Sequence, residues 1–271
     1  MPIPLKSGTA MGSVTESARW VRRLLRAFGC DPKALLTCLA GMPRYLKDLA
    51  DYRRRSEGTA FPLSLRELDP VFSDFRAPAG TAEGHYFHQD LWAARKVFGR
   101  RPRRHIDVGS RIDGFVAHLL VFMPVEVVDI RPLASGVVGL RFLQTDATDL
   151  LALADNSIES LTSLHAAEHF GLGRYGDAID PDACFRFMAA LERVLAPDGR
   201  LYFSVPIGRE RLAFNALRVF GVDTIFQRFS CLQCVSLSYV DDDGALHEDV
   251  QREQIPSSEY ACGLFEFTKL P

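Results

Sequence analysis

The chain has 271 residues, of which 47% are hydrophobic and 24% are charged, a composition typical of one sizeable globular domain with an appendage. Its net charge of −2 excludes the overall positive field of a dedicated nucleic-acid-binding protein. The six cysteines are scattered instead of forming a disulfide framework, and no apolar run reaches membrane-spanning length or has the features of a leader. We therefore expect a cytoplasmic protein that binds no nucleic acid.

Residues 1–82 are expected to form a helical N-terminal appendage and a connector. Over residues 17–28, apolar side chains recur at helical spacing with arginines opposite, which predicts a basic amphipathic helix. Such a helix can touch a membrane surface or a partner, or it can pack on the main domain. A second helix is predicted to begin at Pro32, to be interrupted at residues 41–43 and to resume over residues 44–54. Prolines and glycine over residues 61–81 predict an irregular connector to a main domain at residues 83–271.

A segment rich in polar and aromatic residues, 83–92, opens the main domain and leads into a helix predicted over residues 90–98. It contains two histidines, His85 and His88. One interpretation is aromatic packing of this helix over the edge of a sheet. The other is a lid that closes over a ligand and presents His85 or His88 to a substrate.

The sequence from His105 to Asp129 predicts a strand, a turn at Gly109, a helix over residues 114–123 and a second strand over residues 125–130. A glycine at such a turn lets the backbone approach a ligand, and an acid about 20 residues on can accept hydrogen bonds from a ribose diol. Asp129 occupies that second position. Because the turn is Gly-Ser-Arg-Ile-Asp-Gly and not Gly-x-Gly-x-x-Gly, a dinucleotide is not the favoured ligand.

Further strands are predicted over residues 139–144, 158–164, 200–205, 231–240 and 263–269. Helices are predicted over residues 181–195 and 208–229, the latter with a break at Gly221. Five strands that alternate with helices, followed by two strands without a long helix between them, predict a mostly parallel sheet closed by an antiparallel strand. The main domain is therefore expected to be an α/β domain with helices on both faces of the sheet.

Five motifs occur in a definite order along this domain. They are Asp107-Val-Gly109, Asp129, Asp146-Ala147, the segment 163–169 and the segment 195–201. In this order they resemble the motifs of class I S-adenosylmethionine-dependent methyltransferases. The segments 86–92, 107–118, 164–177 and 202–211 also resemble a family of uncharacterised proteins, first described from nematodes and common in bacteria, within that superfamily. The resemblance covers residues 84–269.

The resemblance implies a Rossmann-like sheet of seven strands in the order 3-2-1-4-5-7-6, with the last strand antiparallel. It implies S-adenosyl-L-methionine as cofactor, with Asp107 and Gly109 facing its methionine part, Asp129 its ribose, and Asp146 with Ala147 its adenine. The cofactor-binding residues that it implies are Asp107, Gly109, Ser110, Arg111, Asp129, Ile130, Asp146, Ala147 and His165. At Arg111 the superfamily usually has a glycine, so this side chain can either crowd the cofactor or pair with its methionine carboxylate.

A cluster of ionisable residues follows the fourth predicted strand, where ligands meet open α/β sheets. Methyl transfer depends mainly on alignment, and a base is required only if the acceptor must lose a proton. His165, Glu168 or His169 can serve as that base; alternatively, one histidine caps the local backbone while Glu168 holds its ring. The pattern His-x-x-Glu-His also occurs in zinc proteases, where it lies on a continuous helix. Here Gly171 and Gly173 follow at once, so neither a protease nor a metal site is predicted. With His88 of the lid, the catalytic candidates are His165, Glu168, His169 and His88.

The sequence thus predicts an enzyme that transfers a methyl group to the hydroxyl of a small molecule or glycan. The glycan is suggested by the lid histidines and by the polar loop over residues 171–177. Two alternatives stay open: a non-catalytic methyltransferase-like protein that binds a partner through its N-terminal helices, and an enzyme that uses a nucleotide sugar or NAD on the same fold. The acceptor and the oligomeric state are not predicted.

Overall fold

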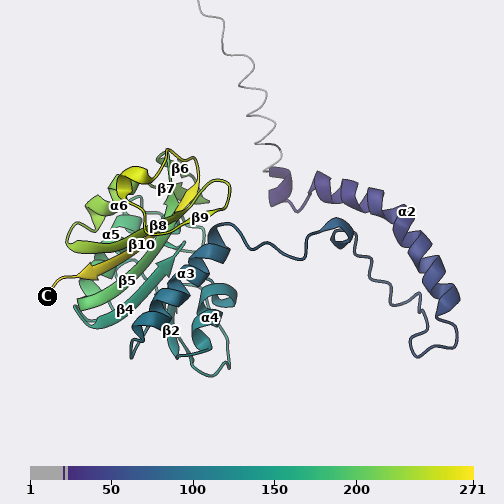
Figure 1. The fold of residues 1–271 in the computed structure, drawn as a ribbon, viewed down its shortest axis with the longest axis horizontal. Helices are drawn as coiled ribbons and strands as arrows, with labels where there is room; N and C mark the ends of the chain where they lie inside the picture. Colours follow the sequence, from purple (N-terminus) through teal and green to yellow (C-terminus); the bar gives the residue numbers. More distant parts are fainter. Residues whose placement is uncertain (1–20, 22–23) are drawn as a thin grey trace, which may run out of the picture. The chain divides into compact units, whose positions relative to one another are not determined.

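The computed structural model describes Val21 and residues 24–271, which belong to two compact units, residues 1–80 and residues 81–271. Figure 1 draws the chain with its elements labelled. Within the described residues, no helix is both long enough and apolar enough to cross a membrane. Of the helix predicted over residues 17–28, residues 17–20 and 22–23 lie outside the described residues, and Val21 and residues 24–27 are helical.

The first unit contains the helix α2, Pro32–Arg55, and a short 3-10 helix, Asp74–Arg76. Asp31 caps α2 by accepting a hydrogen bond from the backbone N–H of Lys33 at 2.9 Å. The predicted interruption at residues 41–43 is wrong, because α2 runs unbroken through Pro43. A proline removes only one helical hydrogen bond, and the residues on both sides are mostly strong helix formers such as leucine, alanine, lysine and arginine.

The second unit is built on one sheet of eight strands in the order β3-β2-β1-β4-β5-β10-β8-β9. The first five are β1 (Ile106–Val108), β2 (Val125–Asp129), β3 (Leu140–Gln144), β4 (Ile158–Leu164) and β5 (Leu195–Ile207). They run parallel to one another, with β1 between β2 and β4. Because all five strands run parallel, their carboxyl ends lie at the same edge of the sheet.

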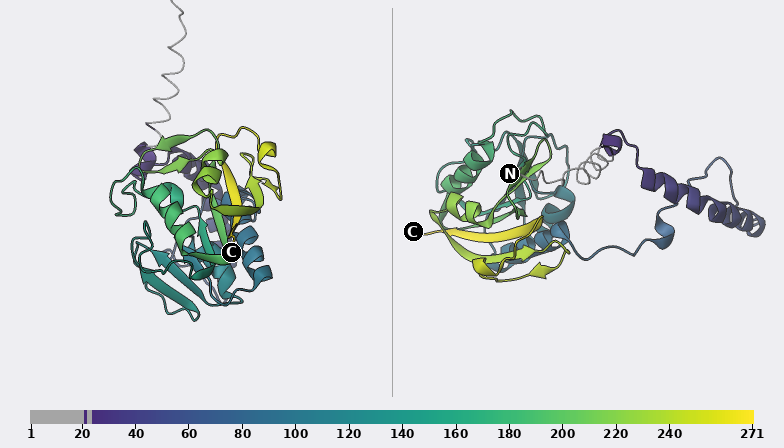
Figure 2. Two further views of the ribbon diagram at one scale, coloured as in Figure 1. Left: turned by 90° about the vertical axis from the view of Figure 1, so that its left-hand side faces the viewer. Right: turned by 90° about the horizontal axis from the view of Figure 1, so that it is seen from above.

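The remaining strands are β8 (Leu232–Val240), β9 (Leu246–His247) and β10 (Ala261–Lys269). β10 pairs antiparallel with both β5 and β8, as Figure 2 lets the reader follow in the yellow strand. The predicted mostly parallel sheet with an antiparallel last strand is confirmed, and so is its strand order. The predicted number of seven is wrong by one, because β9 adds an eighth strand at the edge beside β8.

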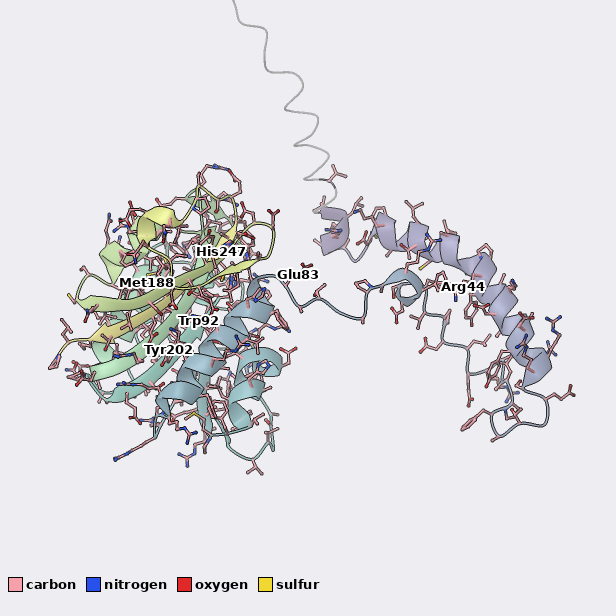
Figure 3. The ribbon with its side chains drawn as sticks, viewed as in Figure 1. Arg44, Glu83, Trp92, Met188, Tyr202 and His247 are labelled. Atoms are coloured by element: carbon pink, nitrogen blue, oxygen red, sulfur yellow. The ribbon has the colours of Figure 1, made fainter. Side chains whose placement is uncertain are left out.

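Helices cover both faces of the sheet, and the alternation of side chains along β5 separates the two layers. Leu201 and Phe203 pack in the cluster with α5 (Ala183–Val194) and α6 (Val222–Arg228). Tyr202 points to the other face, where its ring meets Trp92 edge-on at 6.1 Å, and both residues are labelled in Figure 3. That face is covered by α3 (His85–Arg100), a π-helical turn (Ile112–Val116) and α4 (Ala117–Leu120).

The helix predicted over residues 208–229 is wrong in its first half. The segment forms a separate hairpin of β6 (Arg211–Ala213) and β7 (Leu217–Val219), and only α6 after Gly221 is helical. Asn215 turns the hairpin in a left-handed conformation with φ of 62°, which asparagine tolerates. Glu210 accepts hydrogen bonds from the Gly221 N–H at 3.0 Å and from the Thr224 hydroxyl, so it ties the hairpin to the start of α6.

Candidate functional site

A cavity of about 750 Å³ lies at the carboxyl ends of the parallel strands. Its wall is formed by the residues that follow β1, β2, β3 and β4, the place where ligands bind in open α/β sheets. Ten of the residues predicted from sequence line it: Gly109, Ser110, Arg111, Asp129, Ile130, Asp146, Ala147, His165, Glu168 and His169. The structure therefore brings most of the predicted site together in one place.

Gly109 begins the wall after β1 in a left-handed conformation, with φ of 75°. A Cβ atom at this position would lie 3.0 Å from the Cβ atom of Ala166, tighter than ordinary van der Waals contact. The Gly109 N–H donates to the carbonyl of Val128 at 3.0 Å, which holds the turn against β2. A glycine is thus required here both by the backbone and by the close approach of the loop after β4.

Asp107 lies beneath this turn and does not reach the cavity wall. Its carboxylate accepts hydrogen bonds from the Ser110 N–H at 3.1 Å, the Ser110 hydroxyl at 2.5 Å and the Thr162 hydroxyl at 2.6 Å. Complete burial raises the pKa of Asp107 to about 6, against the lowering effect of these hydrogen bonds. Asp107 therefore holds the turn in shape from below instead of facing a ligand.

His105, directly before β1, extends the same network to the adjoining strand β4. Its Nδ1 lies 2.8 Å from the Ser160 hydroxyl and its Nε2 lies 3.0 Å from the Thr162 hydroxyl. Burial lowers the pKa of His105 to about 3, so the ring is neutral at physiological pH. The network joins β1 to β4 beneath the cavity and fixes the two strands whose ends form its floor.

Asp129 ends β2 and is bound by Arg131. The Arg131 guanidinium donates from Nε to Oδ1 at 3.0 Å and from Nη2 to Oδ2 at 2.5 Å, and the Arg131 backbone N–H donates to Oδ1 at 2.8 Å. The same guanidinium lies 4.6 Å from the centre of the Tyr175 ring. Because Arg131 bridges Asp129 and Tyr175, it links the end of β2 to the loop that follows β4.

Arg111 lies at the mouth of the cavity instead of filling it. Its guanidinium pairs with Asp113 at 3.1 Å and lies 5.0 Å from the centre of the Tyr86 ring. About half of the Arg111 side chain is exposed. The Arg111 side chain, for which the sequence left open whether it crowds the cofactor or pairs with its carboxylate, is thus turned toward the surface, between α3 and the loop after β1.

The loop after β3 contributes Asp146 and Ala147. The Asp146 Oδ1 accepts a hydrogen bond from the Thr148 N–H at 2.8 Å, a turn that presents the buried Ala147 to the cavity. Just after the neighbouring strand β2, the backbone carbonyl of Ile130 accepts a hydrogen bond from the side-chain amide of Gln144 at 3.1 Å. Ile130, Asp146 and Ala147 thus form a part of the cavity wall next to Asp129 that has both apolar and polar side chains.

His165 follows β4 in a left-handed conformation with φ of 50°, which is uncommon for a residue with a side chain. Its Nδ1 lies 2.7 Å from Glu168 Oε1, and both side chains are almost completely buried. Burial lowers the pKa of His165, but the acidic groups of Cys262 and Glu168 outweigh burial and raise it well above the usual value. Neither His165 Nε2 nor Glu168 Oε2 has a hydrogen-bond partner among the described residues.

His169 differs from His165 in the partner of its ring. Its Nδ1 lies 2.7 Å from the backbone carbonyl of Ala216, which can only accept a hydrogen bond, so Nδ1 carries the proton and Nε2 is the basic nitrogen. Nε2 lies 3.8 Å from Glu168 Oε1. Burial lowers the pKa of His169, in part against the influence of Glu168. The ring is therefore held in the tautomer that a general base requires.

His88 is not part of the cavity wall; its ring meets the edge of Phe87 at 5.4 Å. Instead, the other lid histidine, His85, stacks on His165 at 5.4 Å and on Tyr260 at 5.1 Å. The sequence analysis also missed Tyr260, which comes from the segment before β10 and lines the cavity. A sequence pattern offers no signal for Tyr260, because it meets His85 across 175 positions of the chain.

A family model described as "Caenorhabditis protein of unknown function, DUF268" matches residues 144–256. Over these residues, the resemblance to a family first described from nematodes is confirmed. A search of the curated proteins found no match to the chain.

Solved structures of similar fold include several methyltransferases. The 1,6-didemethyltoxoflavin-N1-methyltransferase of Burkholderia thailandensis, solved with S-adenosylhomocysteine, is 17% identical with a TM-score of 0.48, over 68% of this chain and 79% of that one. The YcgJ protein of Bacillus subtilis is 16% identical with a TM-score of 0.48, over 68% and 99%. The N-methyltransferase NodS of Bradyrhizobium japonicum, also solved with S-adenosylhomocysteine, is 14% identical with a TM-score of 0.47, over 69% and 88%.

Proposed function

We propose that this protein is a methyltransferase that uses S-adenosyl-L-methionine. One observation carries the proposal: the Gly109 turn, the Asp129 carboxylate and the Asp146–Ala147 loop open onto one cavity of about 750 Å³. They follow β1, β2 and β3, which are neighbours in the sheet. This arrangement suits an elongated nucleoside whose amino-acid part lies at Gly109, whose ribose lies at Asp129 and whose base lies against Ala147.

The ion pair with Arg131 leaves room for this role of Asp129. A carboxylate offers about four lone-pair sites, and Arg131 uses three of them, so one site on Oδ2 is left for a ribose hydroxyl. The pair also orients the Asp129 carboxylate at the end of β2. Arg111, at the mouth of the cavity, is available to the carboxylate of the methionine part if it exchanges its exposed partner Asp113.

The expected acceptor is a hydroxyl of a small molecule or glycan, and His169 is the residue best arranged to take its proton. S-adenosyl-L-methionine would supply an electrophilic methyl group on a sulfonium. His169 Nε2 would accept the hydroxyl proton while the carbonyl of Ala216 keeps Nδ1–H in place. Glu168 Oε1, 3.8 Å from Nε2, would stabilise the imidazolium that forms. We further propose that the reaction takes place in the cytoplasm, as the scattered cysteines suggest.

The first test is cofactor binding measured by isothermal titration calorimetry with S-adenosyl-L-methionine and S-adenosylhomocysteine. The wild-type chain should bind both, and Asp129→Ala should lose binding because the ribose loses its carboxylate. Asp155→Ala is the matched control, since Asp155 is exposed, pairs with Arg193 and lies outside the cavity wall. Absence of binding to the folded wild-type chain at millimolar ligand would contradict the proposal.

The second test concerns the base and the acceptor. Release of S-adenosylhomocysteine should be followed with a panel of hydroxyl-bearing small molecules and oligosaccharides. With an accepted substrate, His169→Gln should lower turnover by about 100-fold or more while cofactor binding is unchanged. Unchanged turnover in His169→Gln would show that the acceptor needs no base from this residue.

Two alternatives are distinguished by ligands. Three arginines on the cavity wall, Arg111, Arg131 and Arg174, favour an anionic ligand, and a nucleotide-sugar- or NAD-using enzyme would bind its diphosphate through them. That reading predicts stabilisation by a sugar nucleotide or NAD in a thermal-shift assay, without stabilisation by S-adenosyl-L-methionine. If the protein is instead a non-catalytic one that binds a partner through its N-terminal helices, Asp129→Ala should leave partner binding intact.

A further inference from the structure

Three metal-ligand side chains meet behind the cavity, and each comes from a different element. His85 is the first residue of α3, His165 follows β4, and Cys262 lies in β10. One nitrogen or sulfur atom of each lies within 4.8 Å of the other two. We propose that His85, His165 and Cys262 bind a zinc ion.

His165 is already arranged as a metal ligand. Histidines that bind a metal almost always donate their second ring N–H to a carboxylate or carbonyl, which fixes the tautomer. Glu168 Oε1 lies 2.7 Å from Nδ1 of His165, so in the neutral, metal-binding form of the ring the lone pair is on Nε2. That nitrogen is buried and lacks a hydrogen-bond partner among the described residues, a costly state unless something else binds it.

His85 has the same arrangement with a backbone partner. Its ring makes a hydrogen bond with the backbone of Tyr260, which leaves the other nitrogen for the cluster. His85 is half-buried, and its ring stacks on that of His165 with the ring centroids 5.4 Å apart, which holds it against the cluster. Its position is fixed by the Gly84 N–H, which donates to the carbonyl of Gly244 at 2.9 Å.

Cys262 is the third proposed ligand, and it lies within the sheet, in β10. It pairs with Pro206 of β5 and Val240 of β8, and its side chain is completely buried. Its Sγ atom makes only long hydrogen-bond contacts to oxygen among the described residues, with the Gly263 carbonyl at 3.8 Å and Gln89 Oε1 at 4.0 Å. A buried thiol beside two imidazoles is a strong ligand for a thiophilic cation.

A doubly charged ion would also balance the charge of this region. Glu168 is 1% exposed, and its Oε2 has no partner among the described residues, so the carboxylate is poorly compensated by His165 alone. A zinc ion with the Cys262 thiolate and the Glu168 carboxylate gives a net charge near zero in the buried region. The ion would therefore bind the unpartnered His165 Nε2 and offset the charge of the buried Glu168 carboxylate.

The ligand types select the ion. Two imidazole nitrogens and one thiolate suit zinc and do not suit calcium or magnesium, which require oxygen ligands. The set also differs from the His-x-x-Glu-His zinc pattern in the sequence, because His169 Nδ1 is bound to the Ala216 carbonyl and Glu168 supports His165 instead of coordinating. Zinc with three protein ligands keeps a fourth position for water or another group.

The expected effect of the ion is to join the start of α3 to the sheet beside the cavity. His165 and Tyr260 line the large cavity, and His85 and Tyr260 line a second hollow of about 430 Å³, so the cluster lies between the two. This inference concerns the metal alone and does not depend on methyl transfer.

The test is zinc stoichiometry of the full chain. The protein is incubated with zinc chloride, freed of loosely bound metal by gel filtration, and analysed by atomic absorption. One zinc per chain is expected for the wild-type protein, and His85→Ala and Cys262→Ser should lose it. Glu168→Gln should weaken zinc binding by about 10- to 100-fold in competition with a chromophoric chelator, as expected for a residue that orients a ligand.

Matched controls separate this cluster from the other histidines and cysteines. His88→Ala, Cys184→Ser and the double variant Cys231→Ser/Cys234→Ser should keep one zinc per chain, because none of these residues belongs to the cluster. Cobalt in place of zinc should give a thiolate-to-metal band in the near ultraviolet that Cys262→Ser removes.

Three results would overturn the proposal: less than one zinc in the folded wild-type chain, one zinc retained in His85→Ala, or loss of zinc only in the Cys231→Ser/Cys234→Ser variant. Circular dichroism checks that each variant is folded. If Cys262→Ser fails to fold, the half-buried His85 still supplies the deciding variant.

Discussion

Helices α2 and α5 belong to different units and differ in what stabilises them. α2 has 24 residues, and none of them is buried among the described residues, whereas α5 has 12 residues and buries most of one face. Leu36 of α2 is 65% exposed and Leu191 of α5 is 0% exposed. α2 depends on its Asp31 cap and on surface ion pairs such as Arg44–Asp48, and α5 depends on packing. The presence of leucines at helical spacing therefore does not tell whether a helix has a core to pack against.

The largest expected effect is on the packed helix. Leu191→Ala should lower the free energy of unfolding of the second unit by about 2–5 kcal/mol, because it removes fully buried methyl groups and leaves a cavity. Urea denaturation followed by circular dichroism measures the change. A loss below about 1 kcal/mol would mean that α5 does not depend on its buried face.

The next effect concerns the pH dependence of stability at two buried groups, Asp107 in β1 and His105 just before it, whose pKa values are shifted in opposite directions. The folded pKa of Asp107 is raised from 3.8 to about 6, so its contribution to stability is present below pH 4 and is lost as the pH rises to 6. The folded pKa of His105 is lowered from 6.5 to about 3, so its contribution is present above pH 6.5 and is lost as the pH falls. Between pH 4 and 6 the two slopes oppose each other.

Asp107→Asn should remove one of these slopes. Relative to wild type, the free energy of unfolding of the variant should rise by about 3 kcal/mol between about pH 3 and pH 7, at 1.36 kcal/mol for each unit of pKa shift, with most of the rise between pH 4 and pH 6. Denaturation at several pH values measures this difference, with the exposed Asp155→Asn as control. Parallel curves for wild type and Asp107→Asn would show that Asp107 has an ordinary pKa.

A smaller effect is expected at the turn that joins the packed core to the cavity. Gly109→Ala should cost about 1–2 kcal/mol of stability, because a side chain is strained at a φ of 75° and its Cβ would approach Ala166. Calorimetry should also show weaker binding of S-adenosyl-L-methionine. Gly99→Ala is a suitable control, since Gly99 lies within α3 and has open space around it. Equal stability of both variants would argue against the strained turn.

The smallest effect is expected on α2. Leu36→Ala should change the stability of the chain by no more than about 0.5 kcal/mol, as is usual for an exposed side chain. It is the same chemical change as Leu191→Ala, so the two variants measure directly how the units differ. A loss comparable to that of Leu191→Ala would mean that Leu36 is covered in solution.

The strands themselves and the cavity floor follow from local sequence features, whereas the strand order was implied by the family resemblance. The β-branched runs ending at Gly109 and Asp129 predict strands and their carboxyl ends, and parallel strands bring those ends to one edge. Most of the predicted binding residues therefore lie in one wall. Asp107 is the exception, because sequence places it at the right position but does not tell that its carboxylate turns inward to Ser110 and Thr162.

Other features depended on contacts between distant residues. The apolar spacing of residues 211–220 fits a helix, yet these residues pair as a hairpin because Asn215 turns the chain and Glu210 binds the start of α6. Likewise, the choice between His85 and His88 depends on where α3 begins and on its contact with Tyr260. Cys262 had no local signal at all, since only the antiparallel pairing of β10 with β5 brings it to His165.

The hydroxyl of Ser110 joins two loops that are far apart in the sequence. It donates a hydrogen bond to Asp107 and accepts one from the backbone N–H of Leu164 at 3.1 Å. One oxygen atom thus couples the turn after β1 mechanically to the end of β4. The turn at Gly109 and the segment entering His165 consequently move as one body. In amide hydrogen exchange, the protons of Ser110 and Leu164 should become accessible in the same opening event, and ligands at either end of the cavity would share a single rigid floor.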